Sequence, residues 1–219
     1  MKVLAVICRK GGVGKTTIAT HLAVAAQNLG LVTAVLDLDP QASSAIWGDA
    51  RKEGAQPAVV AAQPSRLALF IKQAEEQEAD LLILDTPPHS DATATAAAAK
   101  ADAILIPTRP SGLDMAALPT SIDVARAARK PFFVVFNAAP AQGSEVAEAT
   151  GALEAEGIEV SPVVLHNRKA FYSHMPIGET AEEHDPGGKA AAEIRELILW
   201  VADRIGIIPP RRSGLRKTA

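Results

Sequence analysis

The chain has 219 residues, which suits one domain with a substantial apolar core. Its composition is 48% hydrophobic and 4% aromatic, which is typical of a folded domain and excludes a disordered chain. A net charge of −3 excludes global attraction to nucleic acid, and the single cysteine, Cys8, excludes an intramolecular disulfide or a cysteine-ligated cluster within one subunit.

Short apolar runs alternate with longer alanine-rich stretches. The first run is too short to span a membrane. Because strands that are apolar on both faces are typical of sheets buried between helices, we predict an α/β fold: a mostly parallel twisted sheet with helices on both faces. The last helix is expected over about Gly188–Ile205. The expected strands are Val3–Cys8, Val32–Asp37, Leu81–Asp85, Ala103–Pro107 and Phe132–Asn137, with weaker candidates at Pro57–Ala62 and Val160–Leu165.

Polar segments follow these predicted strands. In open parallel sheets, ligands bind where loops leave the carboxyl ends of the strands. The sequence therefore predicts one functional rim on the sheet. The segments expected there are Gly11–Lys15, Asp37–Gln41, Asp85–Pro88, Pro107–Pro110 and Asn137–Pro140.

A glycine-rich loop, Gly11-Gly12-Val13-Gly14-Lys15-Thr16, stands between a strand and a helical pattern. Its glycines would let backbone N–H groups surround a phosphate at the start of the helix. Lys15 would reach the β- and γ-phosphates, the Thr16 hydroxyl would ligate Mg²⁺, and Thr17 would lie near the α-phosphate. The alternative is a turn without a ligand. We predict a P-loop NTPase that binds ATP and Mg²⁺.

Lys10 is not required by the general phosphate-loop pattern. The stretch from Lys10 to Thr17 resembles the deviant Walker A motif of the ParA/MinD family, in which the first lysine crosses to the nucleotide of the partner subunit. The resemblance implies a homodimer that forms on ATP binding. A charge supplied in trans would stabilise the transition state as an arginine finger does, so hydrolysis would depend on dimerisation. A solvated Lys10 is the alternative.

Asp37-Leu38-Asp39-Pro40-Gln41 closes the second predicted strand, and strand alternation places Asp37 and Asp39 on the same side. The segment resembles the switch I pattern of the same family. That resemblance implies that Asp39 positions the attacking water and that Asp37 supports the Mg²⁺ shell. Either carboxylate could instead cap a helix over Gln41–Trp47.

Asp85 ends a buried apolar strand, the arrangement expected of a Walker B carboxylate that holds Mg²⁺ directly or through water. The alternative is an aspartate that merely begins a turn. Asp85-Thr86-Pro87-Pro88 also matches the family's form of this motif.

The resemblance extends from Met1 to about Ile205. Asn137 matches an asparagine that contacts adenine in relatives, and its amide carries both a donor and an acceptor. Lys189 lies where relatives carry a basic residue that meets nonspecific DNA, and Arg168 and Arg195 are weaker candidates nearby. A solvated surface charge is the alternative for each of these basic residues.

The resemblance implies a Mg-dependent ATPase of the ParA partition type, without an N-terminal helix-turn-helix domain. Its ATP-bound dimer would bind nonspecific nucleoid DNA, and a ParB-like centromere-binding partner would stimulate hydrolysis to segregate plasmid or chromosomal DNA. The alternatives are a MinD-like or orphan ParA-like ATPase that positions a protein cargo, and a dethiobiotin-synthetase-like metabolic enzyme. We expect one P-loop ATPase domain over residues 1–206, a flexible basic tail over 207–219, no membrane partner, and a cytoplasmic, nucleoid-associated location.

Overall fold

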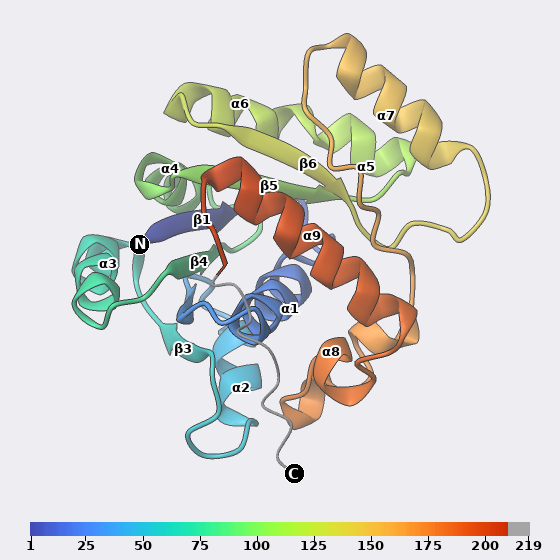
Figure 1. Cartoon of the computed structure of the whole chain (residues 1–219). Helices are drawn as coiled ribbons and strands as arrows, with labels where there is room; N and C mark the ends of the chain where they lie inside the picture. Colours follow the sequence, from blue (N-terminus) through green and yellow to red (C-terminus); the bar gives the residue numbers. More distant parts are fainter. Residues whose placement is uncertain (210–219) are drawn as a thin grey trace.

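The computed structural model of the chain describes residues 1–209, and every strand pairing in that range is parallel (Figure 1). The strands lie in the order β3-β2-β4-β1-β5-β6, so β4 and β1 form the centre of the sheet. Parallel neighbours need crossover connections, and helices supply them here. The structure thus confirms the predicted parallel α/β sheet. The strands are β1 Lys2–Val6, β2 Thr33–Asp37, β3 Ala58–Ala61, β4 Leu81–Asp85, β5 Ala103–Thr108 and β6 Phe132–Phe136.

Helices cover both faces of the sheet, as predicted. On one face α1 packs against α9, and on the other α4 packs against α6 (Figure 1). The α-helices are α1 Lys15–Asn28, α2 Ser43–Asp49, α3 Leu67–Glu76, α4 Asp91–Lys100, α5 Gly112–Ala117, α6 Pro119–Ala128, α7 Glu145–Ala155, α8 Ala181–His184 and α9 Lys189–Ile205. Short 3₁₀ turns occur at Pro64–Arg66, Lys169–Phe171 and Met175–Ile177.

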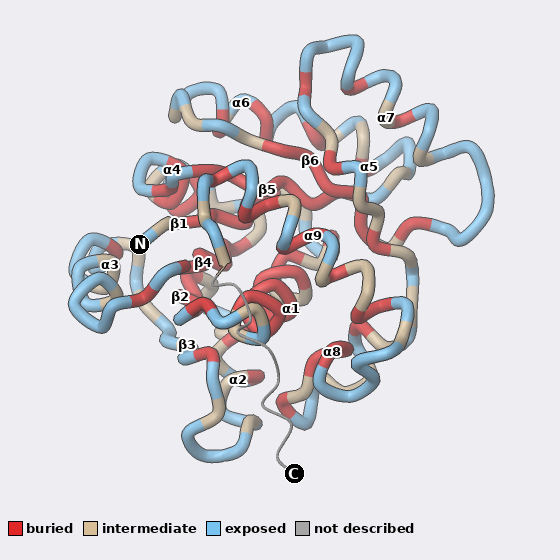
Figure 2. Tube along the Cα trace, in the orientation of Figure 1, coloured by how far each residue is buried: buried red, intermediate tan, exposed pale blue. Residues whose placement is uncertain are grey.

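Strand alternation divides the core between the two faces. On β1, Leu4 and Val6 pack with residues of α1 and α9, whereas Val3 and Ala5 pack with residues of α4 and α6. All of these side chains are buried, and Figure 2 shows buried backbone running through the central strands. Alanines fill much of α1 and α4, so both helices approach the sheet closely.

The expected strand over Val160–Leu165 is wrong. The segment pairs with β6 at an isolated bridge between Val160 and Val134, and the N–H of Leu165 donates to the carbonyl of Phe136. A further bridge lies beyond the end of β6. Pro162 stands within the segment and has no N–H to donate, so a continuous ladder does not form. The other weak candidate, Pro57–Ala62, is confirmed in its central part as edge strand β3.

The observed element ends differ slightly from the predicted ones. β1 ends at Val6 rather than at Cys8, although the N–H of Ile7 still donates to the carbonyl of Leu105 in β5, and α9 begins at Lys189 rather than Gly188. The predicted tail falls outside the described residues from residue 210 onward. No helix within residues 1–209 is long and apolar enough to cross a membrane.

Candidate functional site

The loop after β1 leads directly into α1. Gly14 precedes α1 with a φ of 93°, a left-handed conformation that glycine adopts without steric cost. A Cβ on Gly14 would also overlap Nδ2 of Asn137. Nδ2 of Asn137 donates a hydrogen bond of 2.7 Å to the carbonyl of Val13, which ties the loop to the end of β6. The loop is therefore shaped to present N–H groups at the start of α1, where anions bind.

Lys15, the first residue of α1, is held inside the loop. Its Nζ donates a hydrogen bond of 3.2 Å to the carbonyl of Lys10, and its side chain is buried. Burial lowers the pKa of Lys15, while the charges of Cys8, Asp85 and Asp39 act in the opposite direction. The ammonium thus lies where phosphate oxygens could replace a backbone carbonyl as its partner.

Lys10 is not simply solvated, because its Nζ lies 2.8 Å from Oδ1 of Asp114 in α5. Ser111, which caps α5, also donates a hydrogen bond to the Asp114 carboxylate. Burial alone would raise the pKa of Asp114, but hydrogen bonds from Lys10 and Ser111 and the charges of Lys10 and Arg109 hold that pKa below its ordinary value. In this structure the extra lysine is engaged within its own subunit.

Asp85, at the end of β4, accepts hydrogen bonds from two hydroxyl groups. Oγ1 of Thr16 and Oγ of Ser44 each lie 2.7 Å from Oδ2 of Asp85. Burial raises the pKa of Asp85 to about 6, although the hydrogen bonds from Ser44 and Thr16 oppose this rise. Within the described residues, Oδ1 of Asp85 is buried without a hydrogen-bond partner. A buried carboxylate with an unused oxygen beside a threonine hydroxyl fits a hard divalent cation such as Mg²⁺.

Asp37, paired with Asp85 in the β2–β4 register, contacts the backbone with both carboxylate oxygens. Oδ1 accepts a bond of 2.9 Å from the N–H of Asp39, and Oδ2 accepts one of 3.0 Å from the N–H of Ala45 in α2. Burial raises the pKa of Asp37 and these backbone hydrogen bonds oppose the rise. Asp39 is only partly buried and accepts from the N–H of Gln41. Asp37 thus holds the start of α2, and its metal role stays a prediction.

A pocket of about 330 Å³ opens beside the phosphate loop. Its size suits a small ligand such as a nucleoside. The predicted residues in its wall are Gly12, Gly14, Thr17 and Asn137. Arg109 and Ala138, from two segments expected at the rim, also line it. The sequence analysis did not propose the other lining residues for this site, namely His166, Asn167, Phe171 and Tyr172. They lie between the Val160–Leu165 run and α8, where the sequence shows no ligand motif.

The basic residues considered for DNA lie near the beginning of α9, but two of them are paired. Nη2 of Arg168 is 2.6 Å from Oε1 of Glu193, and this hydrogen bond raises the pKa of Arg168. Arg168 also lines the pocket beside the loop. Nε of Arg195 is 3.2 Å from Oε1 of Glu182. Lys189 is exposed. Contact of these three basic residues with DNA stays a prediction.

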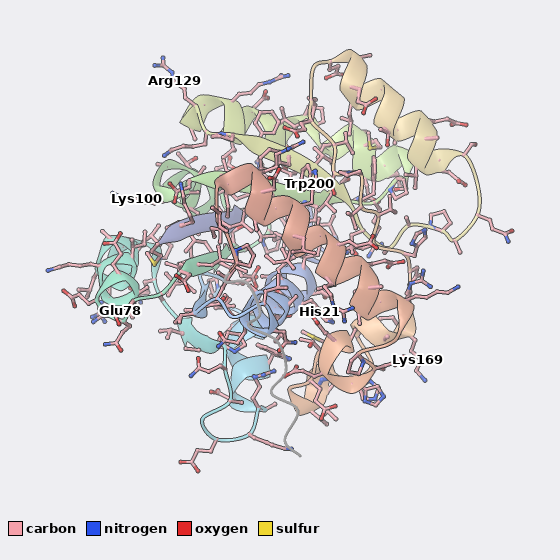
Figure 3. The ribbon with its side chains drawn as sticks, in the orientation of Figure 1. His21, Glu78, Lys100, Arg129, Lys169 and Trp200 are labelled. Carbon is pink, nitrogen blue, oxygen red and sulfur yellow. The ribbon has the colours of Figure 1, made fainter. Side chains whose placement is uncertain are left out.

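His21 is a buried residue of α1 that the sequence analysis did not single out, and Figure 3 shows it near the centre of the molecule. Its Nδ1 lies 2.8 Å from the carbonyl of Thr17, and its Nε2 accepts a bond of 3.1 Å from the N–H of Ala181. These partners require the neutral ring with its proton on Nδ1. Burial lowers the pKa of His21 to about 4. His21 therefore joins the helix after the phosphate loop to α8.

A model of the CobQ/CobB/MinD/ParA nucleotide binding domain matches residues 4–177. Among curated proteins, the chain is similar to maintenance of carboxysome distribution protein A from Halothiobacillus neapolitanus, with 28% identity over 204 residues, covering 89% of this chain and 94% of that protein. The protein of the same name from Gloeobacter kilaueensis is 40% identical over 118 residues, so the chain spans only about half (53%) of that relative's length. Protein ParA from Rhizobium radiobacter is 33% identical over 118 residues, or 52% of this chain and 51% of that protein.

Solved structures of the cell-division ATPase MinD have the same fold. The Pyrococcus furiosus protein superposes with a TM-score of 0.74 at 19% identity, covering 93% of this chain and 99% of that one. The Pyrococcus horikoshii protein, solved with Mg-ADP, gives a TM-score of 0.72 at 18% identity, covering 94% and 97%. At these identities the likeness shows the fold alone. Since the family match contains the phosphate loop, Asp39, Asp85 and Asn137, the chain belongs to the CobQ/CobB/MinD/ParA nucleotide-binding family, as an ATPase of its ParA/MinD type with a deviant Walker A loop.

Proposed function

We propose that this chain is a Mg²⁺-dependent ATPase whose ATP-bound homodimer positions a protein cargo within the cell. The observation that carries the proposal is the similarity to the Halothiobacillus relative, which is named for maintaining carboxysome distribution and aligns with 89% of this chain. The alignment covers 94% of that relative, so it is not confined to the nucleotide-binding motifs. This favours the protein-cargo alternative over the DNA-partition function that the sequence first suggested.

The proposed chemistry is attack by water on the γ-phosphate of ATP. Lys15 binds the phosphates from inside the loop, and Thr16 and Asp85 hold Mg²⁺. When bound, Mg²⁺ neutralises phosphate charge and orients the phosphate groups. Asp39 orients the water, and Asp37 keeps the start of α2 beside it through the N–H of Ala45.

Lys10 is the residue that links hydrolysis to dimerisation in this proposal. Its ammonium leaves Asp114 and reaches the nucleotide of the partner subunit, where it stabilises charge that develops during hydrolysis. The two states of Lys10 make turnover depend on dimer formation. Cargo release would then follow hydrolysis, with nonspecific DNA as the surface on which the dimer rests and a second protein as the stimulator.

Segregation of plasmid or chromosomal DNA with a ParB-like partner is the second candidate function. It is supported by the 33% identity to Protein ParA of Rhizobium radiobacter over 118 residues. Because that match covers about half of either chain, it supports the shared ATPase core more than the choice of cargo.

The experiment that separates the two functions replaces Lys15 by alanine in the native cell. Tagged protein assemblies encoded near the gene are then followed by fluorescence microscopy, and plasmid-free and anucleate cells are counted in the same culture. We expect misplaced protein assemblies and normal DNA retention. DNA loss with normally placed assemblies would establish partition instead. Purified protein, assayed for ATPase activity with and without DNA and the neighbouring gene product, identifies the stimulator.

A further inference from the structure

The hydroxyl of Ser44 is hydrogen-bonded to Asp85, the carboxylate that the proposed metal site requires. The side chain of Ser44 is fully buried at the start of α2, and its hydroxyl donates to Oδ2 of Asp85 over 2.7 Å. The Thr16 hydroxyl donates to the same oxygen over the same distance. A carboxylate oxygen has two lone-pair positions, and both are taken here. Oδ1 of Asp85 has no partner, but the oxygen that the Thr16 hydroxyl reaches is Oδ2. A cation held by both Thr16 and Asp85 is therefore expected at Oδ2, where it competes directly with Ser44.

The beginning of α2 is tied to the nucleotide rim at a second point. The N–H of Ala45 donates to Oδ2 of Asp37, and Asp37 lies beside Asp85 in the sheet register. Consecutive residues of one helical turn therefore contact the carboxylates that end neighbouring strands. Loss of the Ser44 bond would leave the bond from the N–H of Ala45 to Asp37 as the link between this end of the helix and those carboxylates.

The far end of α2 is held by Arg51 both to the segment before α8 and to α8 itself. Arg51, just beyond the helix, donates to the carbonyl of Gly178 over 2.8 Å and lies 2.6 Å from Oε1 of Glu183. Only 6% of the Arg51 side chain is exposed. Gly178 packs closely against this end of the helix, since a Cβ on Gly178 would lie 2.6 Å from the backbone N of Arg51. A displacement of α2 therefore reaches Gly178 and Glu183 through direct contacts.

We propose that Ser44 is a positioning residue that senses the cation. Binding of Mg²⁺ at Thr16 and Asp85 releases the Ser44 hydroxyl, and α2 carries the resulting shift through Arg51 to the segment that leads into α9. Lys189, the exposed lysine at the start of α9, follows that segment. The inference rests on the proposed Mg²⁺ site and makes no statement about the cargo.

Trp47 offers a direct readout of this movement. It lies in α2 three residues after Ser44, is 2% exposed, and has the guanidinium of Arg51 at 4.5 Å from its ring centroid. The other tryptophan, Trp200, is in α9 and is removed as a signal by Trp200→Phe. In this single-tryptophan protein saturated with ADP, addition of Mg²⁺ should change the Trp47 emission. No change in emission would overturn the proposed coupling.

The deciding variant is Ser44→Ala, with Ser43→Ala as the matched control because Ser43 is exposed in the same helix. Binding of Mn²⁺ to the ADP complex is measured by electron paramagnetic resonance, and Trp47 emission is titrated separately with Mg²⁺. Removing a competing hydrogen bond to a charged group should tighten Mn²⁺ binding roughly tenfold. Ser44→Ala should also lose most of the Trp47 response, while Ser43→Ala should match the parent in both measurements.

Unchanged or weaker Mn²⁺ binding in Ser44→Ala would overturn the competition, because weaker binding would make Ser44 a ligand. A full Trp47 response in that variant would overturn the transmission through α2. If the parent complex binds no Mn²⁺, the metal site itself fails, and this inference fails with it. A cargo other than protein would leave every one of these measurements unaffected.

Discussion

Nζ of Lys10 lies 2.8 Å from Oδ1 of Asp114, so the extra lysine of the phosphate loop is neutralised within its own subunit. One third of the lysine side chain is exposed (33%), whereas that of Asp114 is almost fully buried (8%). A lysine that must reach a partner's nucleotide has to break this pair first. If Lys10 acts in trans as proposed, the pair opposes dimerisation and keeps the isolated subunit in an inactive arrangement.

Asp114→Asn should strengthen the ATP-bound dimer. A partly exposed ion pair contributes on the order of 1 kcal/mol, and a symmetric dimer breaks one such pair in each subunit, so the dimer dissociation constant should fall roughly thirtyfold. Analytical ultracentrifugation with ATP under non-hydrolysing conditions measures it. Asp123→Asn, an exposed aspartate of α6, is the charge-matched control and should have no effect. An equal gain from Asp114→Asn in a Lys10→Ala background would show that Lys10 is not the cause.

Lys10→Ala should separate nucleotide binding from stimulated hydrolysis. Lys15 and the loop remain, so affinity for a fluorescent ATP analogue should change by no more than about twofold, as expected when only transition-state contacts are lost. Stimulated turnover should fall by a hundredfold or more on the order-of-magnitude scale of trans-acting cations. The exposed Lys52→Ala is the control. Stimulated turnover at the parent rate would refute the trans role of Lys10.

The functional rim at the carboxyl ends of the strands could be predicted, because each of its segments is recognised from its own short stretch of sequence. Gly14 and Asp39 lie just after apolar runs, and Asp85 ends one. The carboxyl ends of parallel strands lie at one edge of the sheet, which brings these three residues to the same edge. The absence of a regular strand over Val160–Leu165 could also have been predicted. Pro162 interrupts that apolar run, and a strand ladder needs the N–H groups that proline lacks.

Contacts between distant segments could not be predicted in this way. Asp114 meets Lys10, and Ser44 meets Asp85, only because the fold brings separate loops together. No spacing rule places Arg168 beside a phosphate loop that lies far away in the chain. His21 falls one helical turn after Thr17, yet only its contacts with distant residues such as Phe171 and Ala181 distinguish it from a surface histidine.

His21 should make the protein less stable in acid. Its pKa is about 4 in the folded chain against an ordinary 6.5, so between these values only the unfolded chain binds the proton. The contribution of His21 to the free energy of unfolding is therefore complete above pH 6.5. It falls by about 3 kcal/mol as the pH drops towards 4. Urea unfolding at several pH values measures this slope.

His21→Gln should flatten the slope between pH 6.5 and 4, because the side chain no longer titrates. Its stability at pH 7 should fall, since glutamine cannot keep both the Thr17 and Ala181 hydrogen bonds. A parent-like slope in His21→Gln would assign the acid sensitivity to other groups.

Lys189→Ala should weaken binding of the ATP-bound protein to nonspecific DNA, if the exposed start of α9 is the contact surface. One lost phosphate contact per subunit should reduce the slope of log affinity against log salt by about one for each lysine. Filter binding at several salt concentrations measures this slope. Lys100→Ala, at the end of α4 and away from the start of α9 in Figure 3, is the control. An unchanged salt slope in Lys189→Ala would exclude this lysine from the DNA contact.

Gly14→Ala and Gly151→Ala should have opposite effects on stability. Gly14 has a φ of 93°, and a Cβ there would overlap Nδ2 of Asn137, so alanine should distort the loop and destabilise the fold by more than about 1 kcal/mol. Gly151 lies within helix α7 with open space around its α-carbon. Alanine at that position should stabilise the fold by about 0.5–1 kcal/mol.

The same pair of substitutions tests how the phosphate loop is shaped. Gly14→Ala should lose ATP affinity by on the order of a hundredfold or more, because the N–H groups around the phosphates lose their positions. Gly151→Ala should bind ATP like the parent. In Gly14→Ala combined with Asn137→Ala the overlap is relieved but the positive φ and the broken tie to Val13 remain, so affinity should stay low. Parent-like affinity in the double variant would show that the overlap with Asn137, rather than the left-handed backbone, is what requires glycine at this position.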